Sequence, residues 1–296
     1  MPAAMARRLL FLLIAFLLAA FVSWALFGQM YSMPRRPVRI AEPPQASPHT
    51  PLATEQPSPA PLASVSPLAS SVPNATPGAF TVAIIIDDAG QWPTTERGYL
   101  ALPIPLTLSV LPHVRYTSQI AKEAADAGKG VMLHLPMEPL GRDTAGPGEI
   151  TTAMSDAQIA AQAEDDIAQV PLAKGLNNHE GSKASADPRV MRDVMAVVKT
   201  HDLFFIDSRT NMQSVGERVA QDAGVPAAAR SVFLDNKADV AYTEKMLEET
   251  VAVAKRNGSA IAIGHPRPTT LAALQAMYPK MQAEGVQFVL ASELVH

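Results

Sequence analysis

The sequence contains no cysteine, which excludes disulfide bonds, a thiolate metal site and a cysteine nucleophile. Any bound metal therefore depends on His, Asp, Glu and water. Positive charge is not in excess: the net charge is −4, the pI is about 6.0 and no basic stripe is present, so we expect no nucleic-acid partner. The chain also lacks a Gly-x-Ser-x-Gly elbow, a Walker loop and a dinucleotide fingerprint, which leaves acyl-serine chemistry and nucleotide cofactors without support.

One long hydrophobic run is present, the nineteen uncharged residues Leu9 to Phe27, which follow Arg7 and Arg8. About 20 apolar residues span a bilayer, whereas the apolar core of a cleavable signal peptide has roughly 7 to 15. We therefore expect residues 1–30 to form a single-pass anchor in the inner (cytoplasmic) membrane, with a signal peptide as the alternative. Arg7 and Arg8 favour a cytoplasmic N-terminus, which places the C-terminal domain in the periplasm or cell envelope.

The composition divides the rest of the chain in two. Pro, Ala, Ser and Thr dominate from Pro37 to Pro77, a composition that cannot bury a core. We expect residues 31–79 to be an extended, disordered linker. From residue 80 onward, apolar runs alternate with helical patterns, which predicts a folded domain over residues 80–296.

The alternation predicts an α/β fold with a parallel sheet, because single helices separate successive strands. Seven or eight such units favour a closed or nearly closed, distorted parallel (β/α)7–8 barrel, with a doubly wound open sheet as the runner-up. The expected strands are Val82–Ile86, Leu106–Val110, Gly130–Leu133, Lys174–Leu176, Leu203–Ile206, Val232–Leu234, Ala260–Ile263 and Val286–Leu290. The expected helices are Thr117–Ala127, one beginning after Ser155, one from Pro188 to about Thr200, Val215–Ala223, Tyr242–Arg256 and Thr269–Ala283.

Polar residues follow most of these strands, and in a parallel barrel all such positions meet at one face. Helix capping alone explains Ser208 and Asp235-Asn236, but not three histidines at strand ends. Carboxylates with imidazoles and no thiolate suit a divalent ion that activates water for hydrolysis, with a carboxylate as base and a histidine as acid. The strand-end residues are Asp87-Asp88, His134, Asn177-Asn178-His179, Asp207-Ser208-Arg209, Asp235-Asn236 and His265.

Five segments in this order resemble a known family: IIIDDAG, HLPMEP, GLNNHEGS, FFIDSRT and AIGHP. The first resembles the Asp-Asp-Gly motif of NodB-type polysaccharide deacetylases, and the whole set is most similar to their divergent branch. The resemblance implies that Asp87 is the base, that Asp88 and His134 bind a metal, and that His265 is the general acid. The metal would be zinc, with cobalt, manganese or nickel as alternatives.

The sequence departs from the family pattern at Glu138, which stands where a second metal-binding histidine is usual. His179 is therefore the expected third ligand, with Glu138 as a competing ligand, a supporting residue or a partner of Arg209. Asn177, Asn178, Asp207 and Arg209 are expected to orient the substrate or to support the ligands.

The resemblance implies metal-dependent removal of acetyl groups from an N-acetylated cell-envelope glycan, such as peptidoglycan. Two alternatives remain open at this stage. One is a catalytically silent scaffold that binds glycan or protein. The other is a glycosidase that uses Asp87 with Asp207 or Glu138, for which the separation of the carboxylates is the first test.

Overall fold

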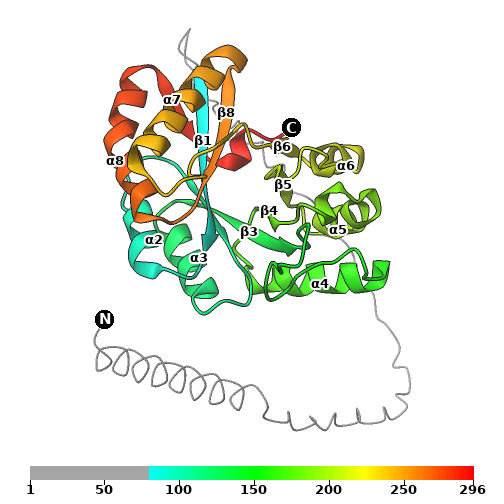
Figure 1. The fold of residues 1–296 in the computed structure, drawn as a ribbon. Helices are drawn as coiled ribbons and strands as arrows, with labels where there is room; N and C mark the ends of the chain where they lie inside the picture. The colour runs from blue at the N-terminus through cyan, green and yellow to red at the C-terminus, as the bar shows by residue number, and fades with distance from the viewer. Residues whose placement is uncertain (1–79) are drawn as a thin grey trace, which may run out of the picture. The chain divides into compact units, whose positions relative to one another are not determined.

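The apolar run that begins at Phe80 forms the central strand of a parallel sheet in the computed structural model, which describes residues 80–296 (Figure 1). The strands are β1 (Phe80–Ala89), β2 (Thr107–Val110), β3 (Gly130–Met137), β4 (Gly175–Glu180), β5 (Phe204–Asp207), β6 (Ala227–Ala229), β7 (Val232–Phe233), β8 (Ser259–Gly264) and β9 (Val286–Val289). The helices are α2 (Pro93–Leu100), α3 (Thr117–Asp126), α4 (Asp156–Gln169), α5 (Pro188–Thr200), α6 (Gly216–Asp222), α7 (Val240–Asn257) and α8 (Pro268–Ala283), with short 3-10 turns η1 (Ala184–Ala186) and η2 (Ala291–Glu293).

The strand order is β6-β5-β4-β3-β2-β1-β8-β7, and every described pairing is parallel. One edge of β1 pairs with β8 from Thr81 to Ile86. The opposite edge pairs first with β9 and, further along, with β2. The sheet curls so that the helices cover its outer side, with α4, α5 and α6 along one part and α7, α8, α2 and α3 along the other (Figure 1).

The expected parallel α/β arrangement is confirmed, but the barrel does not close, because no ladder joins β6 to β7 in the described part of the chain. Only Arg230 and Ser231 separate these two strands. Parallel neighbours need a crossover of a dozen or more residues, so two strands joined by two residues cannot pair in parallel. The sheet is therefore a curled parallel sheet that stays open between β6 and β7.

All eight predicted strands and all six predicted helices are present, and the predicted caps of α4, α5 and α7 are confirmed. Ser155 and Gln158 form a capping box at α4, and Asp187 caps α5 ahead of Pro188. Gly258 ends α7 in the left-handed conformation, with φ of +85°. The sequence analysis missed α2 and β6. Helix α2 buries Glu96 and Tyr99 instead of an apolar stripe, and β6 consists of three alanines.

Alternation along β1 separates two layers of core. Ile84 and Ile86 belong to the large cluster under the helices, whereas Ala83 and Ile85 belong to a smaller cluster on the inner side of the curl. Asp87 is the next residue of β1 on the same side as Ala83 and Ile85. Ala291 of η2 belongs to the inner cluster too, so the C-terminal segment helps to fill this side.

The predicted anchor (residues 1–30) and linker (residues 31–79) lie outside the described residues. Within residues 80–296, none of the helices has the length and hydrophobicity needed to cross a bilayer.

Candidate metal and catalytic site

The inner rows of neighbouring strands end in the side chains that the sequence analysis singled out. Met132 on β3 and Ile263 on β8 belong to the inner cluster. His134 follows Met132 by two residues, and His265 follows Ile263 by two residues. The pairing of neighbouring strands places Ile85 of β1 opposite Ile263 of β8, and His134 of β3 opposite Asn177 of β4. Residues far apart in sequence thus meet at the carboxyl ends of the strands, in a pocket of about 550 Å³.

Adjacent residues of a strand normally point to opposite sides, yet both aspartates of β1 reach this pocket. The backbone explains how, since Asp88 has φ of +56° and the pairing with β2 shifts register between Ile86 and Ala89. Aspartate tolerates this left-handed conformation better than most residues. The turn is supported by Glu96, whose Oε1 accepts hydrogen bonds from the N–H groups of the next loop at 2.8 to 3.0 Å.

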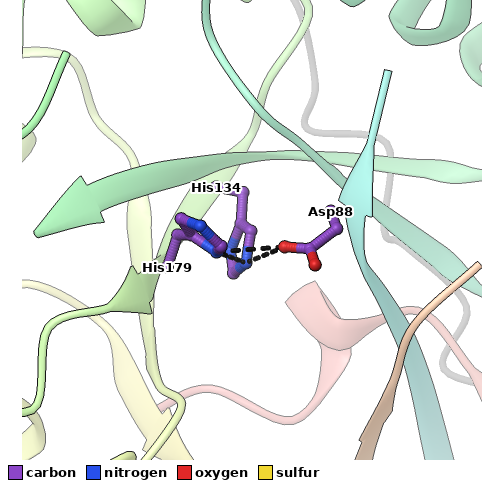
Figure 2. A group of neighbouring side chains, drawn as sticks. All are labelled: Asp88, His134 and His179. Atoms are coloured by element: carbon purple, nitrogen blue, oxygen red, sulfur yellow. Dashed lines mark hydrogen bonds and ion pairs between the residues drawn. The ribbon is translucent and has the colours of Figure 1, made fainter. Parts of the chain in front are cut away.

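Asp88, His134 and His179 form a tight cluster in which the three side chains point toward one another (Figure 2). Asp88 Oδ1 lies 3.3 Å from His134 Nε2 and 3.0 Å from His179 Nδ1, and the two ring nitrogens are 3.1 Å apart. Asp88 Oδ1 is buried and makes no geometrically sound hydrogen bond within the described residues. A buried carboxylate oxygen without a hydrogen-bond donor is typical of a site that binds a cation.

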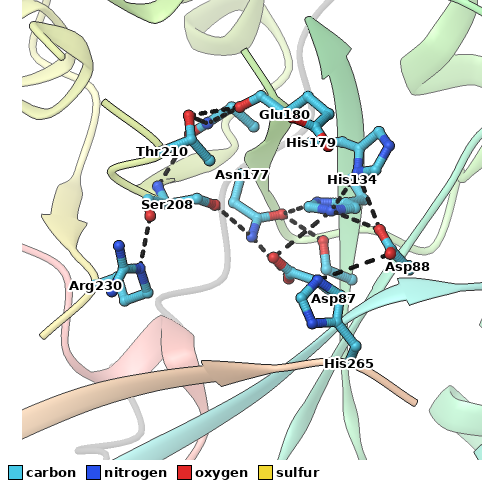
Figure 3. Close-up of polar contacts among 12 residues, drawn as sticks. Asp87, Asp88, His134, Asn177, His179, Glu180, Ser208, Thr210, Arg230 and His265 are labelled. Carbon is cyan, nitrogen blue, oxygen red and sulfur yellow. Dashed lines mark hydrogen bonds and ion pairs between the residues drawn. The ribbon is translucent and has the colours of Figure 1, made fainter. Parts of the chain in front are cut away.

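The ring tautomer of His134 supports the same reading (Figure 3). Asn177 Nδ2 donates to Asp87 Oδ1 at 2.9 Å and to Ser208 Oγ at 3.0 Å, which leaves Asn177 Oδ1 facing His134 Nδ1 at 2.8 Å. Ser109 Oγ donates to the same Asn177 oxygen. His134 Nδ1 therefore carries a proton, and Nε2 is the ring nitrogen that faces the cluster and would bind an ion there. Two imidazole nitrogens and one carboxylate oxygen are a donor set suited to zinc or a similar divalent ion.

The two neighbouring aspartates have opposite pKa shifts. Burial raises the pKa of Asp87, which is 3% exposed, despite the opposing effects of His134 and Asn177. Burial also acts on Asp88 and favours its neutral form, but the close approach of the His134 and His179 rings outweighs burial and holds the pKa of Asp88 well below its usual range. Asp87 thus has the character of a proton acceptor, and Asp88 that of a permanently ionised ligand.

His265 faces this pair from β8. Its Nε2 lies 3.8 Å from Asp88 Oδ2, and its Nδ1 lies 2.9 Å from Asp235 Oδ1. Asp235 Oδ2 also accepts hydrogen bonds from the His265 backbone and from Thr270. Burial lowers the pKa of His265, but the hydrogen bond to Asp235 and the charges of Asp88 and Asp235 outweigh it and raise the pKa overall. The ring is oriented and biased toward the protonated form.

Glu138 and Arg209 do not pair, so that expectation is wrong. The Glu138 carboxylate bonds Lys183 at 2.7 Å and both the N–H and the hydroxyl of Thr152, and it is not part of the Asp88 cluster. Strand β3 ends at Met137, and the loop that follows carries Glu138 to these partners. Arg209 lines the pocket but bonds Glu217 at 2.6 Å.

The remaining predicted residues stabilise loops around the pocket. Asp207 accepts hydrogen bonds from Arg209 N, Ser214 Oγ and Glu217 N, and it is not a pocket-lining residue. Asn178 accepts from Ser208 N and donates to the backbone of Glu180, and its side chain lines the pocket.

Three participants were missed by the sequence analysis: Asp235, Ser109 and Arg230. Asp235 was interpreted as a helix cap, but Asp239 caps α7 and Asp235 supports His265. Its position directly after a strand was the available signal. Ser109 could have been recognised because it is a polar residue inside a buried strand. Arg230 lies in the two-residue connection between β6 and β7, where no motif or strand end pointed to a site.

Comparison with known proteins found relatives by sequence and by structure. A protein of Haemophilus influenzae described as uncharacterized is 36% identical over 195 residues, which cover 66% of this chain and 70% of that protein. Uncharacterized protein YibQ of Escherichia coli is 35% identical over 215 residues, 73% of this chain and 67% of YibQ. Among solved structures, an uncharacterized protein of Agrobacterium tumefaciens has a TM-score of 0.70 at 23% identity and covers 73% of this chain and 89% of its own.

The similarity to that solved structure concerns the fold, a NodB-like curled parallel sheet. The assignment of the family rests on the sequence, because residues 84–295 match a family model described as divergent polysaccharide deacetylase. The matched segment includes β1 from Ile84 onward and every residue of the site. The chain belongs to the divergent polysaccharide deacetylase family.

Proposed function

We propose that the protein is a metal-dependent deacetylase that hydrolyses the acetamide of an N-acetylated glycan of the cell envelope, such as peptidoglycan. The proposal rests on one observation: the Asp88, His134 and His179 cluster has a separate carboxylate, Asp87, and a separate imidazole, His265, beside it. Family membership supports the reaction class.

Asp88 Oδ1, His134 Nε2 and His179 Nδ1 would hold the ion, for which zinc suits the donor set, with cobalt, manganese or nickel as alternatives. A divalent ion bound there would supply Lewis acidity to the acetyl carbonyl and to water. Glu138 is engaged elsewhere, so we propose His179 rather than Glu138 as the third ligand.

The protein's own groups would then move the protons. Asp87 Oδ2, 3.6 Å from His134 Nε2, is free to take a proton from water while Asn177 fixes Oδ1. Water adds to the acetyl carbon, and the carbon–nitrogen bond breaks to release acetate. His265 Nε2 donates the proton that the leaving amine needs, and Asp235 stabilises the imidazolium that precedes this step.

Acetate release from an N-acetylated glycan tests the reaction, with wild-type protein beside Asp87→Asn and His265→Ala. General acid–base groups typically contribute about 10²- to 10⁴-fold, so each variant should lose activity on that scale. Acetate release that Asp87→Asn leaves unchanged would remove the assignment of the base. No release from any glycan by metal-loaded protein would favour the catalytically silent scaffold.

We infer the cellular location of the protein from its sequence. Residues 1–30 would anchor the chain in the inner membrane, and residues 31–79 would tether the catalytic domain, residues 80–296, in the periplasm or envelope. Cell fractionation with protease access from the periplasmic side checks this arrangement, since a domain that stays protected until the inner membrane is opened would overturn it.

A further inference from the structure

Arg230 presents a fixed guanidinium to the same pocket. Its Nε donates to the carbonyl of Ser208 at 2.7 Å, and its Nη2 donates to the carbonyl of Arg209 at 3.0 Å. The ring of Phe233 packs against the cation, with 4.9 Å between Cζ and the ring centroid. These contacts hold the side chain in one orientation before any ligand binds.

The charge of Arg230 is not matched by a partner within the described residues. Arg209, its neighbour in the pocket wall, has Glu217, whereas Arg230 makes no ion pair with a carboxylate among residues 80–296. Burial lowers the pKa of Arg230, and Asp87 and Asp207 oppose this shift from a distance. A half-buried guanidinium whose only partners are neutral carbonyls destabilises the folded protein unless an anion pairs with it.

Only one side of the Arg230 guanidinium donates hydrogen bonds to the protein. The two carbonyls occupy the side formed by Nε and Nη2, so the end formed by Nη1 and Nη2 remains available. That end is a planar pair of donors whose spacing matches the two oxygens of a carboxylate. A flexible lysine would not give this geometry.

The position of Arg230 relates it to the reacting groups. The Phe233 ring that packs against Arg230 lies edge-on to the His265 ring, with 5.3 Å between centroids. On the other side, Ser208 links Arg230 through Asn177 to Asp87 (Figure 3). A group bound by Arg230 would therefore lie beside the sugar that carries the acetamide.

We propose that Arg230 is an anion-binding residue of the substrate site and that the preferred substrate is an N-acetylated glycan with a carboxylate next to the reacting acetamide. This inference rests on the proposed deacetylase function. A bidentate, charge-assisted pair with Arg230 would select acidic glycans over neutral ones.

The test compares disaccharides that differ in one charge, with the carboxylate either free or methyl-esterified. Two acids are used, one with the carboxylate on a lactyl ether and one a uronic acid, so that the two sources are distinguished. Wild type, Arg230→Gln and the control Arg218→Gln are measured as full-length, metal-loaded protein, and binding to metal-free protein is measured by calorimetry. Arg218 is exposed and bonds Asp222 on the same helix, away from the pocket.

We expect Arg230→Gln to raise KM for at least one free acid about tenfold to a hundredfold, the range for a hydrogen-bonded charged pair. Its kcat and its activity on the esters should change less than about threefold. Arg218→Gln should match the wild type throughout. Equal loss on acid and ester would mean a structural role and would overturn the proposal.

Calorimetry separates this inference from the deacetylase assignment. If no disaccharide releases acetate but wild type binds an acid more tightly than its ester and Arg230→Gln abolishes the difference, the anion site stands and the reaction does not. Equal binding of acid and ester by the wild type would overturn the anion site. Tighter binding of a phosphorylated disaccharide than of either acid would overturn the carboxylate assignment.

Discussion

The side-chain oxygen of Asn177 accepts a hydrogen bond from His134 Nδ1 at 2.8 Å. Because the amide nitrogen of the same residue donates to Asp87 Oδ1 at 2.9 Å, one side chain orients both a proposed ligand and the proposed base. The two functions can be separated by mutation, since they use different atoms of the amide.

Asn177→Asp keeps an oxygen toward His134 but replaces the donor to Asp87 with a negative charge. We expect metal affinity to stay within about tenfold of wild type while deacetylation falls by about 10²-fold or more, on the scale of lost general-base catalysis. Metal affinity is measured by competition with a chelator. Asn177→Ala removes both contacts and should lower affinity and activity together. Loss of both functions in Asn177→Asp as well would show that they cannot be separated.

The pairing of Asp235 with His265 leads to a prediction for pH dependence. The Asp235 hydrogen bond and charge raise the pKa of His265, although burial lowers it, so Asp235→Asn should lower that pKa. A general acid must be protonated, and activity falls as pH rises through its pKa. The alkaline limb of the pH–rate profile should therefore move to lower pH in Asp235→Asn.

Thr270→Val is the matched control for Asp235→Asn, because it removes one hydrogen bond to Asp235 Oδ2 and leaves the charge. Its alkaline limb should stay close to that of the wild type. An unchanged limb in Asp235→Asn would show that His265 is not the group that titrates there.

Glu96 leads to a prediction about the loop that follows Asp88, residues 90–92. The carboxylate is fully buried, and its Oε1 accepts hydrogen bonds from three backbone N–H groups, those of Gly90, Gln91 and Trp92. Glu96→Ala leaves these donors without their acceptor and should lower the free energy of unfolding by about 1–3 kcal/mol or more. Glu96→Gln keeps an acceptor oxygen and should cost less in urea unfolding. An equal cost for both would assign the effect to charge alone.

Asp166 gives a prediction for stability outside the site. Burial raises its pKa from 3.8 to about 7, even though His113 lies 2.9 Å away. The folded state then holds the proton more tightly than the unfolded state, so stability falls as pH rises from about 4 to about 7. The contribution is at most about 4 kcal/mol.

Asp166→Asn removes this titration and keeps the size of the side chain. Relative to wild type, the variant should therefore gain stability as pH rises over the same range, which unfolding curves at several pH values will show. Asp222→Asn is the control, because Asp222 is largely exposed and pairs with Arg218 on α6 instead of with His113 or Asp166. A difference between Asp166→Asn and wild type that stays constant with pH would contradict the assignment.

Much of the site was predictable from strand ends, because alternation along a strand fixes which side chains share a row. Asp87, His134 and His265 each continue an inner row that is apolar further back in the strand. Asp88 was also expected at this site, and it lines the same pocket. The left-handed backbone conformation that turns its side chain there, with φ of +56°, was not predicted.

Contacts made by loops were harder to predict than contacts made by strands. Glu138 follows β3 in sequence, but its partners Thr152 and Lys183 come from two other connections, and nothing local indicates which carboxylate they will engage. The openness of the sheet also depends on a short connection, that between β6 and β7, where β6 has no β-branched residue to signal a strand.

The metal content of the purified protein, measured by mass spectrometry, decides whether the Asp88, His134 and His179 cluster is a metal site. We expect about one divalent ion per chain in the wild type. Asp88→Ala, His134→Ala and His179→Ala should lose it while remaining folded by circular dichroism, and Glu138→Gln should keep it, because Glu138 bonds Lys183 and Thr152 instead of the cluster. A wild-type protein that holds no ion after zinc, cobalt, manganese and nickel are offered would contradict the account.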